Sequence, residues 1–385
     1  MSSMGTMERI LRLMADKQAS DVYLSAHSPV LIKINGEAMP INNQVLPADA
    51  PLALLAEVLP PQRIEELQEL GELNLGLPMT GVGNFRISGF RQRGSYAAVI
   101  RYIPNKIPPL NSLKLPPILA DLIMEKRGLM LMVGATGAGK STTLASMIDH
   151  RNATTLGHIL TIEDPVEFLF TNKKSVVNQR EVGSDTQSLQ VALKNALRQA
   201  PDVILIGEIR DRETMSAAIA YAQSGHLCLA TMHANNSYKA LNRILSFYPV
   251  EVRSTMLGDL AAAMKAIVSQ RLLRTQDGSR TPAVEVMLNT ELISELIENG
   301  DFSGVKEAME KSMAEGSQTF EQDIAKLIAD GTVSRKEGLV HADSPTNLMW
   351  RLENDFHIAA KAAAASEEDP DDEPSFTEIT LDVTH

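Results

Sequence analysis

Hydrophobic positions in the first hundred residues follow two periodicities. Met7, Ile10, Leu11 and Met14 recur at helical spacing, which predicts a helix over 7–14. The stretch VYLSAHSPVLIKINGEAMPI alternates with the period of strands, and its Asn-Gly step predicts a hairpin. GVGNFRISGFRQRGSYAAVIRYI again has the pattern of strands. Residues 1–103 are therefore expected to form a small α+β domain.

A proline-rich stretch follows this domain. PNKIPPLNSLKLPP holds five prolines, which cannot feed a helix or a sheet ladder, so residues 104–118 are expected to be a semi-rigid linker. Beyond it short apolar runs alternate with helical patterns, over residues 119–280. Such alternation predicts a parallel sheet with helices on both faces.

From about residue 255 the patterns are mostly helical. Leu257, Leu260, Ala261 and Met264 begin one amphipathic face, and HIAAKAAAAS is expected to be another helix. We therefore expect a helical C-terminal region over 281–365, followed by an acidic tail.

Charge and composition refine this division. The net charge is −12, but the last twenty residues, 366–385, carry eight acids and no lysine or arginine, so the rest of the chain stands at −4. Such a tail is typical of a solvated, disordered appendage, with a binding role as the alternative. A nearly neutral body argues against a protein that coats nucleic acid.

Cysteine content and hydropathy bear on the compartment. The chain has one cysteine, which excludes an internal disulfide framework and fits a reducing cytosol. The segment MSSMGTMERILRLMADK lacks the apolar run of a signal peptide. No run of about 18 apolar residues occurs, so insertion into a membrane is not expected.

The first apolar strand of the second unit ends in GATGAGKST, which satisfies G-x-x-x-x-G-K-[ST]. Backbone N–H groups of such a loop wrap phosphates, helped by the positive N-terminus of the next helix. Lys140 would reach the β- and γ-phosphates, and the Ser141 hydroxyl would ligate Mg²⁺. The predicted nucleotide-binding residues are Gly134, Ala135, Thr136, Gly137, Ala138, Gly139, Lys140, Ser141 and Thr142.

Acidic and histidine side chains follow other predicted strands. Glu163 follows HILTI, Glu208 follows DVILIG, and His233 follows HLCLATM. In an open parallel sheet the ligand crevice lies at the carboxyl ends of the strands, so these residues are expected on one rim with the phosphates. His233 is expected to hydrogen-bond either the γ-phosphate or a carboxylate near it.

A metal shared by His226 and His233 is a competing interpretation of SGHLCLATMHANN. Side chains seven positions apart on a strand point to opposite faces, and on a helix they lie about 10 Å apart along the axis. Neither arrangement lets both hold one zinc ion. His226 is either linked to the nucleotide or a satisfied structural histidine.

Four segments, GATGAGKST, ILTIEDPVEF, ALRQAPDVILIGEIRD and SGHLCLATMHANN, resemble in this order the Walker A, Asp, Walker B and His boxes of the secretion ATPases of type II secretion and type IV pili. The resemblance covers about residues 1–350, including TFEQDIAKLIADGTVS and HADSPTNL, and is strongest to the PilT/PilU branch of pilus retraction motors. It implies a PAS-like N-terminal domain, a RecA-like ATPase core and a hexameric ring with ATP between subunits.

The resemblance also implies roles for residues. Glu163 is then the general base, Glu208 acts through Mg²⁺ and water, and His226 and His233 are the His-box pair. Arg86 and Arg101 match positions that approach the neighbouring subunit's phosphates; Arg91 and Arg93 are weaker matches. Since these arginines precede the linker, delivery across a subunit boundary is expected.

Two departures refine the resemblance. TELISELI lacks the arginine of the A-I-R-x-L-I segment of PilT, and the acidic tail is atypical of PilT; both favour PilU. One cysteine cannot build the four-cysteine zinc module of extension ATPases. The expected partners are a PilT-type ATPase and an inner-membrane pilus platform, at the cytoplasmic face of the membrane. A DNA translocase or helicase and a nucleotide-gated scaffold stay open as alternatives.

Overall fold

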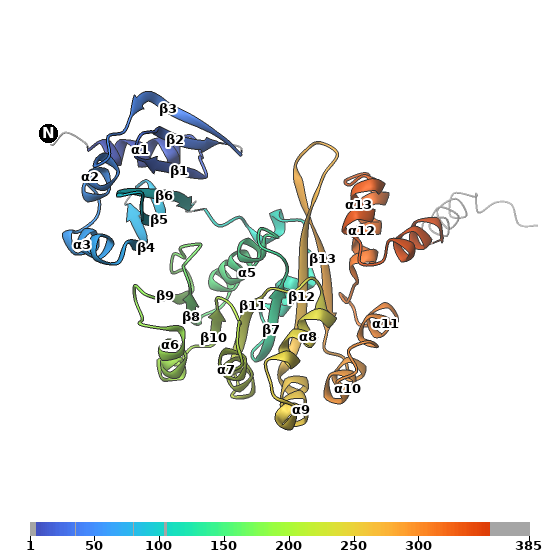
Figure 1. The fold of residues 1–385 in the computed structure, drawn as a ribbon. Coiled ribbons are helices and arrows are strands. Elements are labelled where there is room, and N and C mark those ends of the chain that lie inside the picture. Colours follow the sequence, from blue (N-terminus) through green and yellow to red (C-terminus); the bar gives the residue numbers. More distant parts are fainter. Residues whose placement is uncertain (1–4, 35, 80, 104–105, 355–385) are drawn as a thin grey trace, which may run out of the picture.

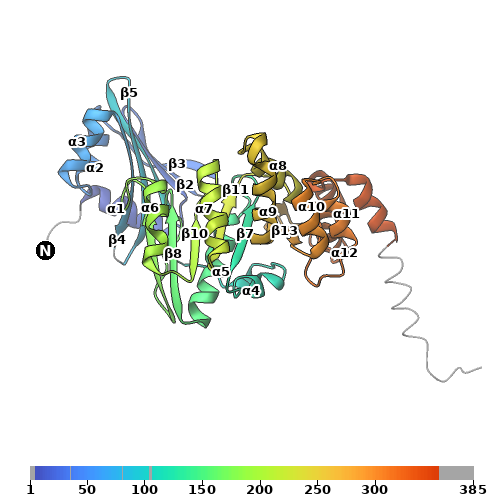
Figure 2. The same ribbon diagram turned by 90° about the horizontal axis from the view of Figure 1, so that it is seen from below.

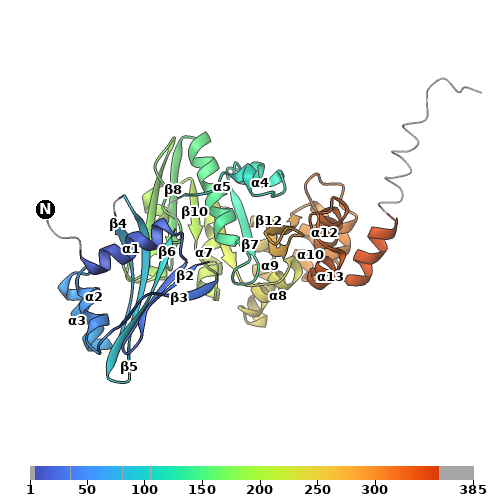
Figure 3. The same cartoon turned by 90° about the horizontal axis from the view of Figure 1, so that it is seen from above.

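The computed structural model describes residues 5–34, 36–79, 81–103 and 106–354. They form an N-terminal domain, a central sheet with helices on both faces, and a group of C-terminal helices, which follow one another across the molecule (Figure 1). Views from below and above show the same order, with the central sheet between the other two units (Figures 2 and 3).

The N-terminal domain is one antiparallel sheet with helices packed on one face. The strand order is β3-β2-β1-β6-β5-β4, and the hairpin between β2 and β3 pairs Ile34 with Glu37. Met7, Leu11 and Met14 of the first helix are fully buried in the domain core, as their spacing predicted. The elements are α1 (Thr6–Asp16), β1 (Asp21–Ser25), β2 (Pro29–Ile34), β3 (Glu37–Val45), α2 (Ala50–Ala56), α3 (Pro61–Leu70), β4 (Glu72–Met79), β5 (Gly83–Gln92) and β6 (Ser95–Ile103).

The central sheet has the order β13-β12-β7-β11-β10-β8-β9, and every neighbouring pair is parallel except β12 and β13. Strand β7, the first strand of this sheet along the chain, is buried on both faces: Leu129 and Leu131 lie in one core cluster, and Met130 and Met132 lie in another. The strands are β7 (Gly128–Val133), β8 (Gly157–Glu163), β9 (Ser175–Glu181), β10 (Val203–Ile206), β11 (Leu227–Met232), β12 (Met264–Arg274) and β13 (Arg280–Leu288).

Helices cover both faces of this sheet. Each of α6, α7 and α8 begins at a residue whose side chain accepts a hydrogen bond from the first turn, which fixes where the helix starts. The helical elements are η1 (Leu110–Ser112), α4 (Ile118–Leu122), α5 (Lys140–Thr154), α6 (Leu189–Ala196), η2 (Leu197–Gln199), α7 (Arg212–Gln223), α8 (Ser237–Ser246), η3 (Val250–Val252) and α9 (Arg253–Ala263).

The C-terminal helices pack beside the edge of the sheet. Phe320 and Ile324 share a small buried cluster with Leu273 of β12 and Ala283 of β13. The helices are α10 (Glu291–Asn299), α11 (Val305–Glu310), α12 (Phe320–Ala329) and α13 (Arg335–His341). The expected helix HIAAKAAAAS and the acidic tail over 366–385 lie outside the described residues.

The expectation of mostly helical structure beyond residue 255 is wrong for 264–288. Helix α9 ends at Ala263, and the chain continues as β12 and β13, which pair along Ala266–Arg274. Strand β12 lies between β13 and β7 and is buried on both faces, so its sequence MKAIVSQRLLR lacks the alternation that marks a half-exposed strand. The border expected at residue 280 therefore falls inside a strand pair.

Candidate nucleotide-hydrolysing site

The carboxyl ends of four parallel strands line one cavity of about 740 Å³, here called the P-loop cavity. The loop after β7, Glu163 at the end of β8, Glu208 after β10 and His233 after β11 all belong to this rim of the sheet. The structure thus brings together the strand-end side chains as the sequence predicted. The cavity also reaches the α6 segment and one arginine of the N-terminal domain.

The loop after β7 presents the start of α5 to this cavity. Gly139 is the N-cap of α5 in the left-handed region, with φ at 87°, and no side chain caps the helix. A Cβ at Gly139 would lie 2.7 Å from Nε2 of Gln270, so glycine is required by both conformation and space. The first N–H groups of α5 therefore stay open to an anion, which is the usual basis of phosphate binding.

Lys140 is largely buried at the base of the loop. Its Nζ donates to the carbonyls of Gly134 and Ala135, each at 2.9 Å. Burial lowers the pKa of Lys140, while Glu208 and Glu167 act in the opposite direction. The ammonium group is thus held among carbonyl oxygens beside the place that a phosphate would occupy.

Gln270 of β12 braces the loop from behind. Its Nε2 donates to the Ala138 carbonyl at 2.8 Å, and its Oε1 accepts from the Thr143 hydroxyl at 2.8 Å. The side chain is buried, so both bonds form away from water. Of the predicted loop residues, those that line the P-loop cavity are Thr136, Gly137, Gly139, Lys140, Ser141 and Thr142, whereas Gly134, Ala135 and Ala138 line an adjoining cavity.

Glu163 is the carboxylate that the structure perturbs most clearly in the cavity. Burial raises the pKa of Glu163 to about 7 against the opposing effect of hydrogen bonds from the side chains of Thr161 and Gln179 and from the backbone of Glu167. Thr161 donates its hydroxyl to Oε1 at 2.6 Å, and Gln179 donates to the same oxygen at 3.4 Å. A carboxylate with such a pKa can take a proton from water near neutral pH.

Glu208 has both carboxylate oxygens engaged. Oε1 lies 3.2 Å from Nε2 of His233, and Oε2 accepts from Nε of Arg210 at 2.8 Å. The His233 side chain is 42% exposed and that of Arg210 is 65% exposed, so both face the cavity rather than the core. The Asp211 carboxylate caps α7 through Thr214 and fixes the loop that carries Glu208.

His226 is not brought to the cavity. It precedes β11 at the amino end of the strand, about 20 Å along the chain direction from His233. Its Nδ1 contacts the Ser224 hydroxyl at 3.1 Å and the Tyr221 carbonyl at 3.3 Å. Within its own subunit it is a satisfied structural histidine, which corrects its inclusion among the catalytic residues. The described residues contain no group of three or more His, Cys, Asp or Glu side chains suited to a metal ion.

Arg101 lines the P-loop cavity of its own chain. The resemblance had instead implied that this arginine reaches the phosphates bound to a neighbouring subunit. Strand β6 pairs with β1 so that Arg101 lies opposite Asp21, and its Nε donates to that carboxylate at 3.0 Å. Arg86 lies opposite Arg101 on β5 and is half-buried. Burial lowers the pKa of Arg86, and Glu167 of the core counteracts this shift.

Four polar residues of the site were not predicted from the sequence: Thr161, Gln179, Arg210 and Gln270. Thr161 precedes Glu163 by two positions on a strand, so both side chains lie on the same face. The alternation of strand side chains is therefore enough to predict that the two residues are neighbours. Arg210 follows Glu208 by two residues, but no periodicity applies in that loop. Gln179 is supplied by β9, and only the pairing of β9 with β8 brings it near.

Comparison with known proteins agrees with this geometry. Residues 71–295 match the family described as Type II/IV secretion system protein. The chain is 44% identical to the type IV pilus ATPase PilU of Pseudomonas aeruginosa over 96% of its length and 98% of that protein. It is 36% identical to PilT of the same organism over 88% of this chain and 98% of the other. A solved structure of the pilus retraction motor PilT with bound ADP superposes with a TM-score of 0.83 at 37% identity, covering 89% of this chain and 98% of that one.

The fold and the cavity define a P-loop ATP hydrolase, and the chain belongs to the type II/IV secretion ATPase family. Within this family it is PilU- and PilT-like. The expected fold class is confirmed: an α/β protein with an N-terminal antiparallel-sheet domain, a mostly parallel core and C-terminal helices. No helix of the described ranges combines the length and the hydrophobicity needed to cross a membrane.

Proposed function

We propose that this chain hydrolyses ATP at the P-loop cavity and uses the energy to retract type IV pili. The observation that carries the enzymatic part is the shared cavity, in which a phosphate-binding loop and the perturbed carboxylate of Glu163 face each other. Glu163 takes the proton of the attacking water, and Lys140 with the N-terminus of α5 holds the phosphates. Arg101 adds positive charge against the phosphates from its own N-terminal domain.

The donor set of the cavity fits Mg²⁺. Ser141 supplies a hydroxyl at the start of α5, and Glu208 supplies a carboxylate on the facing loop, both oxygen donors of the kind that this ion prefers. When bound, the ion would neutralise charge on the phosphate oxygens. Because His233 and Arg210 already contact Glu208, this carboxylate would act on the ion through water, and His233 would sense the γ-phosphate from beside it.

We further propose a homohexamer that works with a PilT-type ATPase on an inner-membrane pilus platform, from the cytoplasmic side. The likeness to PilU and PilT over nearly the whole chain supports this assignment. Nucleic acid is not the substrate, since the chain outside the acidic tail is close to neutral.

Two measurements test the proposal. Purified protein should turn over ATP at a rate that single-stranded DNA leaves unchanged; stimulation by DNA would favour a translocase, and tight ATP binding without turnover would favour a scaffold. In cells lacking their own PilU-type ATPase, the chain should restore pilus retraction when a PilT-type ATPase is present, and Lys140→Ala should not. Retraction that Lys140→Ala restores equally well would contradict a motor role.

A further inference from the structure

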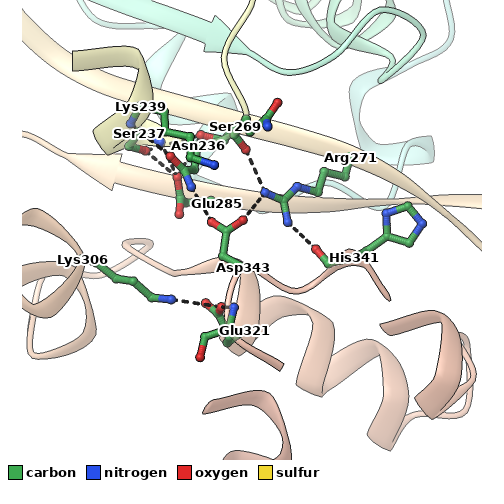
Figure 4. A network of polar contacts seen from close by, with 12 residues as sticks. Asn236, Ser237, Lys239, Ser269, Arg271, Glu285, Lys306, Glu321, His341 and Asp343 are labelled. Atoms are coloured by element: carbon green, nitrogen blue, oxygen red, sulfur yellow. Dashed lines mark hydrogen bonds and ion pairs between the residues drawn. The ribbon is translucent and has the colours of Figure 1, made fainter. Parts of the chain in front are cut away.

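The loop that carries His233 is held at its far end by the C-terminal region (Figure 4). Asn236 donates its side-chain amide to Oδ2 of Asp343 at 2.6 Å. Arg271 of β12 donates to the Asn235 carbonyl at 2.9 Å and also forms an ion pair with Oδ1 of Asp343. Asp343 thus reaches the two residues before α8 by one direct bond and one bond through Arg271.

These contacts are shielded from water. Asn236 is fully buried, and the side chains of Arg271 and Asp343 are 18% and 15% exposed. The guanidinium of Arg271 lies 3.9 Å from the ring centroid of Phe320 and donates to the His341 carbonyl. Charge-assisted bonds in such surroundings are short and directional, so the geometry of the group is tightly defined.

The same contacts limit where His233 can lie. On one side His233 is joined to β11, which pairs with β7 and β10 in the centre of the sheet. On the other side it is followed by Asn235 and Asn236, and the first turn of α8 is fixed because Ser237 donates its N–H and hydroxyl to Glu285 at 2.8 and 2.6 Å. The imidazole is partly exposed, and its Nε2 lies 3.2 Å from Oε1 of Glu208. Its position is therefore set by the backbone on both sides.

We propose that Asp343, acting through Asn236 and Arg271, is a positioning residue that keeps His233 against Glu208 during hydrolysis. This inference rests on the proposed role of His233 at the P-loop cavity. Asp343 lies outside the residues that line this cavity, so it acts only through the loop. Through Asp343, the C-terminal stretch HADSPTNL would thus help to position a residue of the P-loop cavity that lies more than a hundred residues earlier in the chain.

The test is a double-mutant cycle on ATP turnover. Asp343→Asn keeps the size of the side chain but cannot accept from Asn236 and pair with Arg271 at once. It should lower kcat about tenfold, because small displacements of catalytic groups cost one to two orders of magnitude, and leave KM for ATP within about twofold. In a His233→Ala background the same substitution should change kcat less than about twofold, since the residue that it positions is gone.

Controls separate positioning from general damage. Glu353→Gln removes an exposed ion pair with Arg335, 3.6 Å long, in the same C-terminal region and should leave kcat and KM unchanged. Should Asp343→Asn fail to fold, Arg271→Lys, which keeps the charge but loses the planar fork, enters the same cycle with the same expectation.

The outcomes are distinct. An equal fractional loss of kcat in the wild-type and His233→Ala backgrounds would overturn the positioning role and assign Asp343 to structure alone. A parallel rise of KM in both backgrounds would do the same. If His233→Ala itself leaves kcat unchanged, the proposed role of His233 fails, and this single variant reveals it without reference to Asp343.

Discussion

Replacing Thr161 by valine removes the strongest hydrogen bond to Glu163 and should shift the pH dependence of ATP turnover. The threonine is fully buried, and its hydroxyl donates to Oε1 of Glu163 at 2.6 Å. Valine has nearly the same shape without the donor. Since the bond favours the charged carboxylate, its loss raises the pKa of Glu163 beyond its present value of about 7.

The size of the shift can be bounded. A hydrogen bond to a charged group contributes about 1.5–3 kcal/mol, and one pKa unit corresponds to about 1.4 kcal/mol, so removal corresponds to about one to two units. Gln179, now 3.4 Å from the same oxygen, can move closer and offset part of the loss. We therefore expect about one unit, to a pKa of about 8.

The assay is kcat/KM for ATP between pH 5.5 and 9.5 at constant free Mg²⁺. A general base is active when deprotonated, so activity falls as pH drops below the pKa of Glu163, and kcat/KM reports the free enzyme. At pH 7 the deprotonated fraction falls from about one half to about one eleventh, a loss of about fivefold, whereas at pH 9.5 the two proteins should be nearly equal. Titration of ATP itself is common to both and cancels in the ratio.

A matched control is Thr186→Val, the same substitution at a buried threonine whose hydroxyl donates to the Ser188 carbonyl at 3.3 Å outside the cavity. It should leave the pH profile in place. An acidic limb that stays at its wild-type position in Thr161→Val, or that moves to lower pH, would refute the assignment of this limb to Glu163.

Three further predictions concern the charges of the site. Lys140→Ala should weaken ATP binding and abolish phosphate release, because it removes the ammonium group held beside the phosphate position; wild-type turnover would contradict the P-loop assignment. Mixed rings of Arg101→Ala and Lys140→Ala subunits should gain no activity over the separate parents, since both residues line the cavity of one chain; recovery in rings shown to co-assemble would prove delivery across a boundary. Arg210→Ala should lower the Mg²⁺ concentration for half-maximal turnover by at most about fivefold, because its exposed bond to Glu208 is worth up to about 1 kcal/mol; a higher requirement would show that the arginine itself assists.

The residues at the carboxyl edge of the sheet could be predicted from the sequence because each is marked by a short local pattern. The loop before Lys140 is defined by glycines at fixed spacing, and Glu163, Glu208 and His233 each follow a short apolar run whose length and flanking residues predict a buried strand. Knowledge of the sheet order was not needed to place them at one edge, since parallel strands all end there.

The remaining parts of the site depend on long-range packing. The pattern beyond residue 255 predicts mostly helical structure because the burial of β12 on both faces removes the alternation of a strand. The brace that Gln270 gives to the phosphate loop is therefore not predictable from that pattern. Placing Arg101 in its own cavity requires the position of a whole domain, which follows from no pattern in β6. Asn236 and Asp343 are 107 residues apart, and only the packing of the C-terminal helices against β12 and β13 brings them together.

The central claim is that Glu163 performs the proton transfer in a cavity that binds ATP through a separate loop. The most direct test measures ATP binding and phosphate release side by side for the wild type and Glu163→Gln. The amide cannot accept a proton from water but keeps the size of the side chain, so binding within about threefold of wild type with turnover reduced at least a hundredfold is predicted. Undiminished turnover in Glu163→Gln, with loss only in Glu208→Gln, would contradict the claim and exchange the roles of the two acids.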